Sequence, residues 1–423
     1  MNSKRKFTIA DVLNLLMVFC FLRFGLVMTA GFGFFSLPLV VAAGALIVFA
    51  YTFLSKQYSS QFLRTNTIFL LLNIICIVFL RLFMTQASYI STATNYINQL
   101  IILLLLWGFY LCLRKQTPET RKRVTAIYLI AVMISAVYTF YVALNGHSSI
   151  IRNTAFGEFD TRFRFMYGGF DFIYGLVIIY ATLLIVLAQG WKKIRNNVKL
   201  GMLLMLLLTA ATTIISGYST AFALILVFTF LVAPKRKSTK FVLIVVFVFA
   251  VFVFPDAIVD LIEAIPFMPK ITSRRLGEML FSFAGGGSVD YITKDDQRLS
   301  RILWSLQAFG DNPLLGVFAN NSSNRLGNHT EWIDKLAMYG SIAAFCNAGF
   351  WVGTYSRIKR LSEQMPITQR CIVSAFILYF VLGFLNPISM VVTSAPLFIL
   401  CPFAEELFIN ERLDKNLPSE QET

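Results

Sequence analysis

The chain has 423 residues, of which 57% are hydrophobic and 14% are charged. This composition excludes an ordinary soluble domain, because several apolar runs reach the ~20 residues that a helix needs to cross a bilayer. The net charge of +15 does not indicate a nucleic-acid partner, because the basic residues gather in alternate loops between the apolar runs.

The apolar runs are predicted to be helices, because backbone groups inside lipid must find their partners within their own segment. We therefore expect an all-α polytopic membrane protein with about twelve transmembrane helices. The first run is predicted to be a span and not a removed signal peptide, since it is long and no small-residue cleavage site follows. In chain order the predicted spans are 9–30, 33–54, 66–85, 95–113, 124–144, 171–190, 199–215, 219–233, 239–258, 335–356, 370–388 and 390–408.

Lysine and arginine mark the two ends of the chain and every second loop. Examples are the basic residues of 4–6, 121–123, 235–237 and 357–360. The positive-inside rule then predicts that both termini and these loops are cytoplasmic, and an even number of spans fits that orientation. The six cysteines fall within or at the edges of spans, so neither a disulfide framework nor a metal site is predicted.

Two long loops are predicted on the outer side. The first covers about 145–170, and the second lies between the ninth and tenth helices. The second contains "FAGGGSVDY" and "GDNPLLG", and its aromatic and aliphatic content favours a folded cap over disorder. Both histidines, His147 and His329, fall in these loops. The predicted organisation is transmembrane segments 1–258 and 335–408, the outer loop 259–334, and a cytoplasmic tail at 409–423.

Four arginines stand out on or near the outer side. Arg23 and Arg81 interrupt apolar spans, and at ~1.5 Å per residue both lie just over ~20 Å from the inner edge. Each alone could extend to the outer headgroups, but two at matched depth favour a shared anion such as a phosphate. Arg162 and Arg164 alternate with phenylalanines, which fits an interfacial segment and a basic clamp for a lipid-linked phosphate equally well.

The second loop ends in the most informative stretch, "DDQRLSRILWSLQAFGDNPLLGVFANNSSNRLGNHTEWIDKLAMYG". It predicts a short helix that ends at Gly310, followed by turns and by the polar loop Asn320–Asn328. His329, Glu331 and Asp334 then meet the outer end of the next span. The residues that share one side of the short helix are Arg298, Arg301, Trp304 and Ser305.

This stretch resembles the bacterial O-antigen polymerases (Wzy type) and the related O-antigen ligases. "RLSRILWSLQAFGDNPLLGV" is similar to the family's pattern of an arginine, a tryptophan and a short run to Pro-Leu-Leu-Gly-Val. "NHTEWIDKLAMYG" is similar to the histidine segment that opens the following span, although Thr330 departs from the pattern. The stretch Ser216–Phe228 resembles the family's small polar helix opening, but Ser219 and Thr220 stand where an arginine is common, so no arginine role carries over.

The resemblance implies a GT-C-like glycosyltransferase architecture in the bacterial plasma (inner) membrane. It also implies metal-independent transfer between undecaprenyl-diphosphate-linked saccharides on the outer face, with no cofactor, and it gives His329 a catalytic role. A histidine pKa near ~6.5 suits a general base on the acceptor hydroxyl. Glu331 is the rival base, although an acidic residue in a first helical turn is favourable on its own. Arginines are expected to stabilise the departing diphosphate. The candidates are Arg301, Arg81, Arg23, Arg162, Arg164 and Arg298.

The predicted function is polymerisation of lipid-linked repeat units into O-antigen, capsule or exopolysaccharide. Expected partners are the undecaprenyl-diphosphate-linked oligosaccharide, membrane lipids, and a flippase and chain-length regulator of polysaccharide assembly; nucleic acid is not expected. A ligase that moves finished glycan to another acceptor shares the donor chemistry and stays open. A flippase or transporter would instead show internal repeats and interrupted spans with polar groups at the midplane.

Overall fold

The computed structural model of the chain describes residues 65–147, 151, 168–232, 298–388 and 390–409. Within these residues the regular structure is helical, and no strand is formed. The longer helices are α4 (Thr65–Arg81), α5 (Ala87–Arg114), α6 (Pro118–Val142), α8 (Phe170–Gly190), α9 (Asn196–Ile215), α10 (Ser219–Val232), α14 (Arg298–Asp311), α16 (Glu331–Arg360) and α17 (Pro366–Leu385). The short elements are η2 (Ala143–His147), η5 (Trp191–Lys193), α15 (Gly316–Ala319), α18 (Ala395–Ile399), η6 (Cys401–Phe403) and α19 (Ala404–Phe408).

Six of the described helices, α5, α6, α8, α9, α16 and α17, are long and apolar enough to cross a membrane. The prediction of a helical membrane protein is therefore confirmed. The prediction of about twelve spans stays a prediction, because three of those spans lie outside the described residues. These are 9–30, 33–54 and 239–258, and the loop residues 148–150, 152–167 and 259–297 lie outside as well.

Some helices extend beyond the predicted spans. α5 begins at Ala87, eight residues before the predicted start at 95, because the polar stretch "ASYISTAT" continues the helix. α6 begins at Pro118, where Thr117 accepts a hydrogen bond from the backbone N–H of Thr120. A threonine N-cap followed by proline is a strong helix start. The hydropathy of the spans therefore located the helices, and at α6 the Thr117–Pro118 cap determined where the helix begins.

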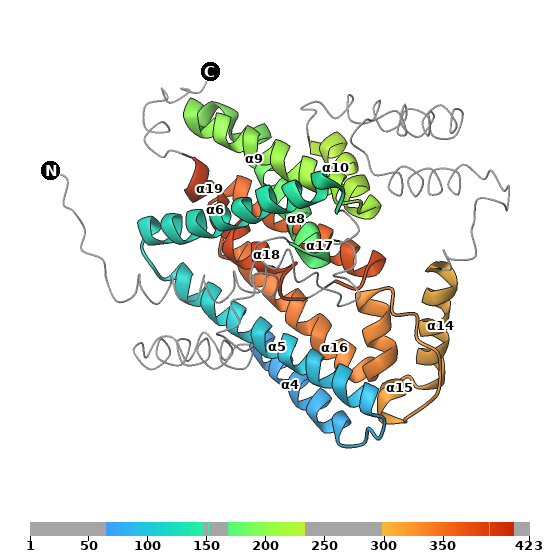
Figure 1. The fold of residues 1–423 in the computed structure, drawn as a ribbon. Helices are drawn as coiled ribbons and strands as arrows, with labels where there is room; N and C mark the ends of the chain where they lie inside the picture. Colours follow the sequence, from blue (N-terminus) through green and yellow to red (C-terminus); the bar gives the residue numbers. More distant parts are fainter. Residues whose placement is uncertain (1–64, 148–150, 152–167, 233–297, 389, 410–423) are drawn as a thin grey trace, which may run out of the picture.

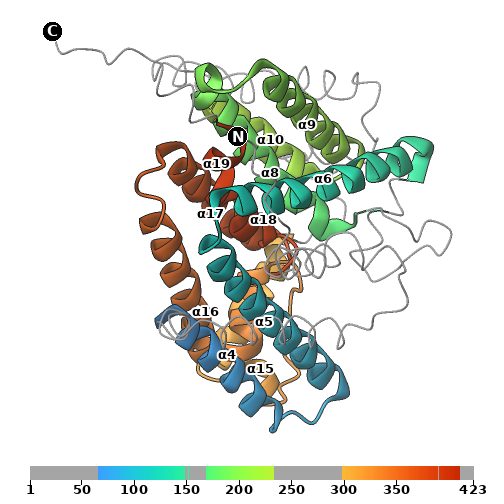
Figure 2. The same ribbon diagram turned by 90° about the vertical axis from the view of Figure 1, so that its left-hand side faces the viewer.

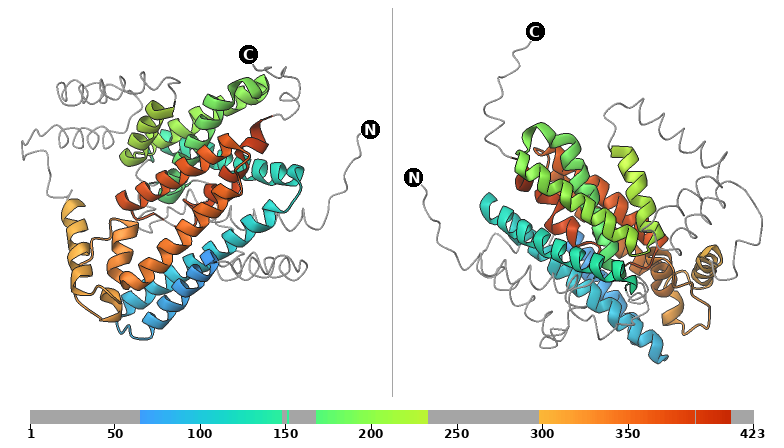
Figure 3. Two further views of the ribbon diagram at one scale, coloured as in Figure 1. Left: turned by 180° about the vertical axis from the view of Figure 1, so that it is seen from behind. Right: turned by 45° about the horizontal axis from the view of Figure 1, so that its top comes forward.

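The described helices form two groups (Figure 1). α4, α5 and α16 run side by side, and α14 and α15 pack against the beginning of α16 at one end of this group. α6, α8, α9 and α10 form the second group, which Figure 2 shows from another side. α17 contacts both α8 and α16 and so joins the two groups, as the rear view in Figure 3 also shows.

An aromatic core lies where the two groups meet. Trp107 of α5 has its ring centroid 6.5 Å from that of Phe350 and 6.2 Å from that of Phe398. Trp351 lies 6.1 Å from Phe398, and all four side chains are at most 1% exposed. The Trp107 indole donates a 3.0 Å hydrogen bond to Thr67 Oγ1 on α4. Packing and interhelical hydrogen bonds of this kind hold helices together in lipid, where the hydrophobic effect cannot.

The predicted last span, 390–408, is not one helix. It is divided into α18, η6 and α19, because Pro396 and Pro402 each remove a backbone donor and hinder a continuous helix. Residues 397–401 are completely buried, and Thr125 on α6 donates its hydroxyl to the Ile399 carbonyl at 3.1 Å. An irregular backbone is tolerated at membrane depth when protein surrounds it. The prediction of a continuous helix here is therefore wrong.

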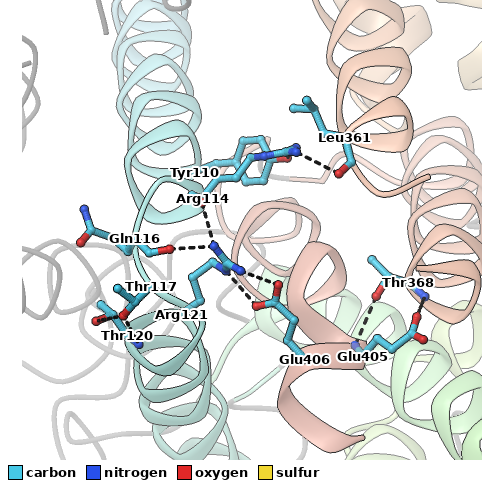
Figure 4. Close-up of polar contacts among 10 residues, drawn as sticks. All are labelled: Tyr110, Arg114, Gln116, Thr117, Thr120, Arg121, Leu361, Thr368, Glu405 and Glu406. Carbon is cyan, nitrogen blue, oxygen red and sulfur yellow. Dashed lines mark hydrogen bonds and ion pairs between the residues drawn. The ribbon is translucent and has the colours of Figure 1, made fainter. Parts of the chain in front are cut away.

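The broken segment connects the two ends of the bundle. Just before it, at the end of α17, the Asn386 carbonyl accepts a 3.1 Å hydrogen bond from the backbone N–H of Glu331. At its end, the Glu406 carboxylate binds the Arg121 guanidinium through two contacts of 2.8 and 2.6 Å (Figure 4). Arg121 also donates to the carbonyls of Arg114 and Gln116, at 2.9 and 2.7 Å. The Arg121–Glu406 pair thus fixes the end of the segment to the α5–α6 turn.

Candidate functional site

The two sequence motifs meet at the end of the bundle where α14 packs on α16. α14 ends at Asp311, one residue beyond the predicted end, so the predicted helix is confirmed. Its Ser305 and Ala308 are buried at 0% and 1% exposure, while Arg301 and Trp304 are half-buried. One face of α14 therefore packs on the bundle, and Arg301 lies at the edge of that face.

Asp334 joins the two motifs. Its carboxylate accepts hydrogen bonds from the backbone N–H groups of His329 and Thr330, at 2.6 and 2.7 Å. It also accepts a hydrogen bond from the Ser305 hydroxyl, whose oxygen in turn accepts one from the backbone N–H of Gly327 at 2.9 Å. Asp334 is 4% exposed, and hydrogen bonds to a buried carboxylate are among the stronger ones in proteins. The network fixes the loop before α16 to α14.

Two glycines bring the motifs into backbone contact. Gly316 and Gly340 both have positive φ values, 77° and 76°. A Cβ atom at Gly316 would lie 2.3 Å from the Met338 carbonyl oxygen, and one at Gly340 would lie 2.2 Å from the Leu314 carbonyl oxygen. α16 therefore has a kink at Gly340, and the Pro-Leu-Leu-Gly turn packs closely against it. Only glycine adopts this backbone conformation without strain or steric clash.

The two candidate bases lie in different surroundings. His329 is half-buried in the loop before α16, next to Asn328 with its positive φ of 51°. Glu331 is 5% exposed, and within the described part of the chain its Oε1 atom has no hydrogen-bond partner. Its carboxylate interacts electrostatically with the buried phenols of Tyr339 and Tyr379. His329 is therefore more accessible to a substrate from outside the bundle than Glu331 is.

Arg301 lies next to the His329 loop. A Cβ atom at Gly327 would lie 2.2 Å from the Arg301 carbonyl oxygen, so the loop runs directly along the backbone of α14 at this point. Arg81 is exposed at the end of α4. The turn after it is held to the polar loop, because Thr85 donates from its backbone N–H and its hydroxyl to Asn321 Oδ1, at 2.7 and 3.0 Å. Arg81 and Arg301 thus belong to segments that converge at the same end of the bundle.

The remaining predicted arginines cannot be placed in this site. Arg298 begins α14, but its side chain lies outside the described part of the structure. The three others lie outside the described residues altogether. They are Arg23, Arg162 and Arg164.

Two further residues of this region were not predicted from the sequence. Arg325 is exposed, and its guanidinium carbon lies 3.7 Å above the ring centroid of Trp304. Lys335 lies 4.6 Å from the ring centroid of Tyr96 on α5. Arg325 lies between the two motifs in a loop rich in turn-forming residues, and its position four residues before His329 was the available signal. The contact of Lys335 depends on α5 packing beside α16, which no local pattern specifies.

Among the described residues, no three His, Cys, Asp or Glu side chains gather in a way that could hold a metal ion. No protein-family model and no curated protein matches the chain. The resemblance of the two motifs to a polymerase family therefore stays a prediction, which rests on the motif residues and their arrangement.

Proposed function

We propose that this chain polymerises undecaprenyl-diphosphate-linked oligosaccharide repeat units at the outer face of a bacterial plasma membrane. The observation that carries the proposal is the network of Ser305, Gly327 and Asp334, which fixes the Arg301 helix against the His329 loop. The network thereby fixes the relative position of two separate segments, one that carries the Arg301 cation and one that carries the titratable ring of His329. Glycosyl transfer from a lipid diphosphate needs both kinds of group.

The proposed step is a single displacement. The acceptor hydroxyl oxygen forms a bond to the anomeric carbon of the donor sugar as His329 takes the hydroxyl proton. The bond between the anomeric carbon and the diphosphate oxygen breaks, and its electron pair leaves with the diphosphate. Arg301 and Arg81 stabilise the charge that develops there, because a guanidinium fork matches phosphate oxygens. The proton on His329 is then released to water.

Arg325 is a further candidate for the diphosphate. Its guanidinium carbon lies over the Trp304 ring, and such a cation–π contact orders the arginine without consuming its hydrogen-bond donors. The turn at Asn321 that precedes it is anchored to the α4–α5 turn, and Tyr89 on α5 donates its hydroxyl to the Ser322 carbonyl at 2.8 Å. The loop that carries Arg325 is thus attached at both of these points.

The test is the length of lipid-linked glycans in a strain that lacks this chain. Single repeat units on the carrier lipid are expected for a polymerase. Full-length chains that stay on the carrier would mean a ligase, and unchanged glycans would contradict both enzymatic functions. Complementation with the intact chain is the control for effects on neighbouring genes.

One observation favours a flippase as the second candidate. The segment 390–408 is an interrupted, mostly buried stretch within the bundle, and transporters often contain interrupted spans. Its completely buried residues from Leu397 to Cys401 are almost all apolar, whereas transported ions and saccharides need polar groups at that depth. Lipid-linked single units that accumulate on the inner leaflet, in place of the outer leaflet, in the deletion strain would favour the flippase.

A further inference from the structure

A cavity of about 270 Å³ lies between α16 and α17, beside Tyr96 of α5. Its walls are mostly aromatic and aliphatic, and Ala343, Ala344 and Ala348 leave room along one side. Sites for drug-sized molecules span roughly 300–1,000 Å³, so this cavity suits part of a chain molecule. Among the described residues that line it, Lys335 is the only charged one.

The rim of the cavity is apolar and exposed. On α17, Phe384 lines the cavity and is 52% exposed, and on α16 the lining residue Ala348 is exposed as well. Both helices are long and apolar enough to cross a membrane. Large apolar side chains exposed on such helices face lipid tails, so the cavity opens toward the bilayer.

Two polar groups lie near one end of the cavity. The Lys335 ammonium nitrogen is 4.6 Å from the Tyr96 ring centroid and 5.9 Å from that of Tyr339. Tyr339 lines the cavity and is 1% exposed, and among the described residues its hydroxyl has no hydrogen-bond partner. Four residues of helix separate Lys335 from Tyr339, which corresponds to roughly 6 Å of rise. A buried hydroxyl is costly to leave unpaired, so a partner is expected from the molecule that fills the cavity.

Asn347 and Trp351 also line the cavity, further along α16. The Asn347 Oδ1 acceptor and the Trp351 Nε1 donor also have no partner within the described residues. They are one turn apart on α16, a spacing at which one buried water can satisfy both. A single water can therefore satisfy this pair, and Tyr339 is left as the buried group at which a ligand acceptor would be stabilised.

We propose that this cavity binds one anionic glycerophospholipid of the surrounding membrane. The phosphate lies at Lys335, an ester carbonyl accepts the hydrogen bond of Tyr339, and an acyl chain lies along the alanine side of α16. A polyprenyl diphosphate fits less well, because its chain has no acceptor next to the head group and its several negative charges would meet a single lysine. The cavity begins beside the Arg301–His329 region, because Lys335 directly follows Asp334, but the proposal does not depend on the proposed function.

The test compares ester-linked phosphatidylglycerol with its ether-linked analogue, which keeps the phosphate and the chains but lacks the carbonyls. Binding to the purified full chain is measured by native mass spectrometry as lipid is titrated. The intact chain is expected to bind the ester lipid about 5- to 10-fold more tightly, as expected for one hydrogen bond. Tyr339→Phe should weaken binding of the ester lipid by a similar factor and leave binding of the ether lipid unchanged. Lys335→Gln should weaken binding of both lipids.

Matched controls come from the same helix. Lys359 lies 5.7 Å from the Tyr355 ring centroid, and neither residue borders the cavity. Tyr355→Phe and Lys359→Gln should therefore leave both lipids unaffected, and thermal unfolding without lipid checks that every variant is folded. Equal binding of ester and ether lipids to the intact chain would overturn the proposal, as would displacement of phosphatidylglycerol by an equimolar polyprenyl diphosphate.

Discussion

At the scale of single residues, His329 combines access with a fixed backbone. Its side chain is half-buried, and its backbone N–H is bound to Asp334 at 2.6 Å. The Asp334 carboxylate therefore holds the backbone of the His329 loop in place. In contrast, Glu331 is almost fully buried beside aromatic rings. This contrast favours His329 over Glu331 as the group that reaches an acceptor hydroxyl, although both remain predictions.

The first prediction concerns His329. His329→Gln keeps a polar side chain but cannot accept a proton at neutral pH, so the rate of glycan elongation should fall roughly 100- to 10,000-fold, as it should in His329→Ala. The measurement is glycan elongation in membranes, with protein levels matched by immunoblot. His147→Ala is the control, because nothing in the sequence places it beside the motifs. An active Gln variant would rule out His329 as the base and leave Glu331 as the next candidate.

The second prediction concerns Arg301. Arg301→Ala should lose most activity while the protein still inserts, and Arg301→Lys should restore only part of it, because a point charge lacks the bidentate fork. Arg81→Ala should behave like Arg301→Ala. The same elongation assay measures the effect. Arg360→Ala, an exposed arginine at the far end of α16, is the control. Near-normal activity of both alanine variants would disprove the role of these arginines at the diphosphate.

At the scale of elements, the kink in α16 depends on one glycine. Gly340 has a positive φ and no space for a Cβ atom, while Gly310 on α14 has nothing within 4 Å of its Cβ position. The kink allows the first turns of α16 to pack against the Pro-Leu-Leu-Gly turn and the remainder to run along α4. A straight helix could not make both contacts.

The third prediction compares these two glycines. Gly340→Ala should destabilise the protein by more than the ~1–2 kcal/mol of a strained backbone conformation, because the Leu314 carbonyl must also move. Gly310→Ala should be neutral or slightly stabilising, because alanine is the better helix former. Thermal unfolding in detergent measures both. If both variants unfolded at the same temperature, the contact between the Gly340 kink and the Leu314 turn would not contribute to stability.

The fourth prediction concerns the Arg121–Glu406 pair, whose side chains are 16% and 13% exposed. Arg121→Met should lower the unfolding temperature clearly, because it leaves a partly buried carboxylate without its partner. Adding Glu406→Leu should recover much of that loss, since an apolar pair can replace a buried ion pair. The comparison of the two single variants with the double variant gives the coupling energy. A coupling near zero would mean that the end of the 390–408 segment is held by its other contacts.

At the scale of the whole molecule, the two ends of the bundle differ in character. One end carries the His329 loop, the α4–α5 turn and α14. The other carries the Arg121–Glu406 pair, the α16–α17 turn and Glu405. The Glu405 carboxylate accepts a 3.2 Å hydrogen bond from the backbone N–H of Thr368 (Figure 4) and another of 3.2 Å from that of Ile367. Several of the described basic residues lie at this second end, among them Arg114, Arg121, Lys359 and Arg360. The positive-inside rule predicts that this end is cytoplasmic.

The fifth prediction tests that assignment. Ser323 and Glu363 are both exposed and lie at the two ends. In intact cells, Ser323→Cys should react with a membrane-impermeant maleimide, and Glu363→Cys should react only after the membrane is permeabilised. The intact chain is the background control, because its described cysteines are buried or half-buried. Labelling of both positions from the same side would contradict the topology and the outer-face site together.

The sequence by itself determined the helical membrane architecture and the short helix α14. Apolar runs of span length must become helices, because lipid offers no partner for backbone groups. The spacing of Arg301, Trp304 and Ser305 specifies one face of a helix through local geometry alone. The turn-forming residues around Pro313 and Gly316 likewise specify a turn, because their backbone preferences are local.

Only the tertiary structure decided which of these local elements meet. Ser305 and Asp334 are 29 residues apart in sequence, and Thr85 and Asn321 are 236 apart, so their contacts depend on how whole helices pack. The same packing buries Glu331 and leaves His329 accessible, although the two are neighbours on the same short stretch. It also allows 390–408 to break at its prolines, because the surrounding helices supply the contacts that a lipid-facing segment would lack. Periodicity and hydropathy cannot decide such pairings, because they describe each segment separately.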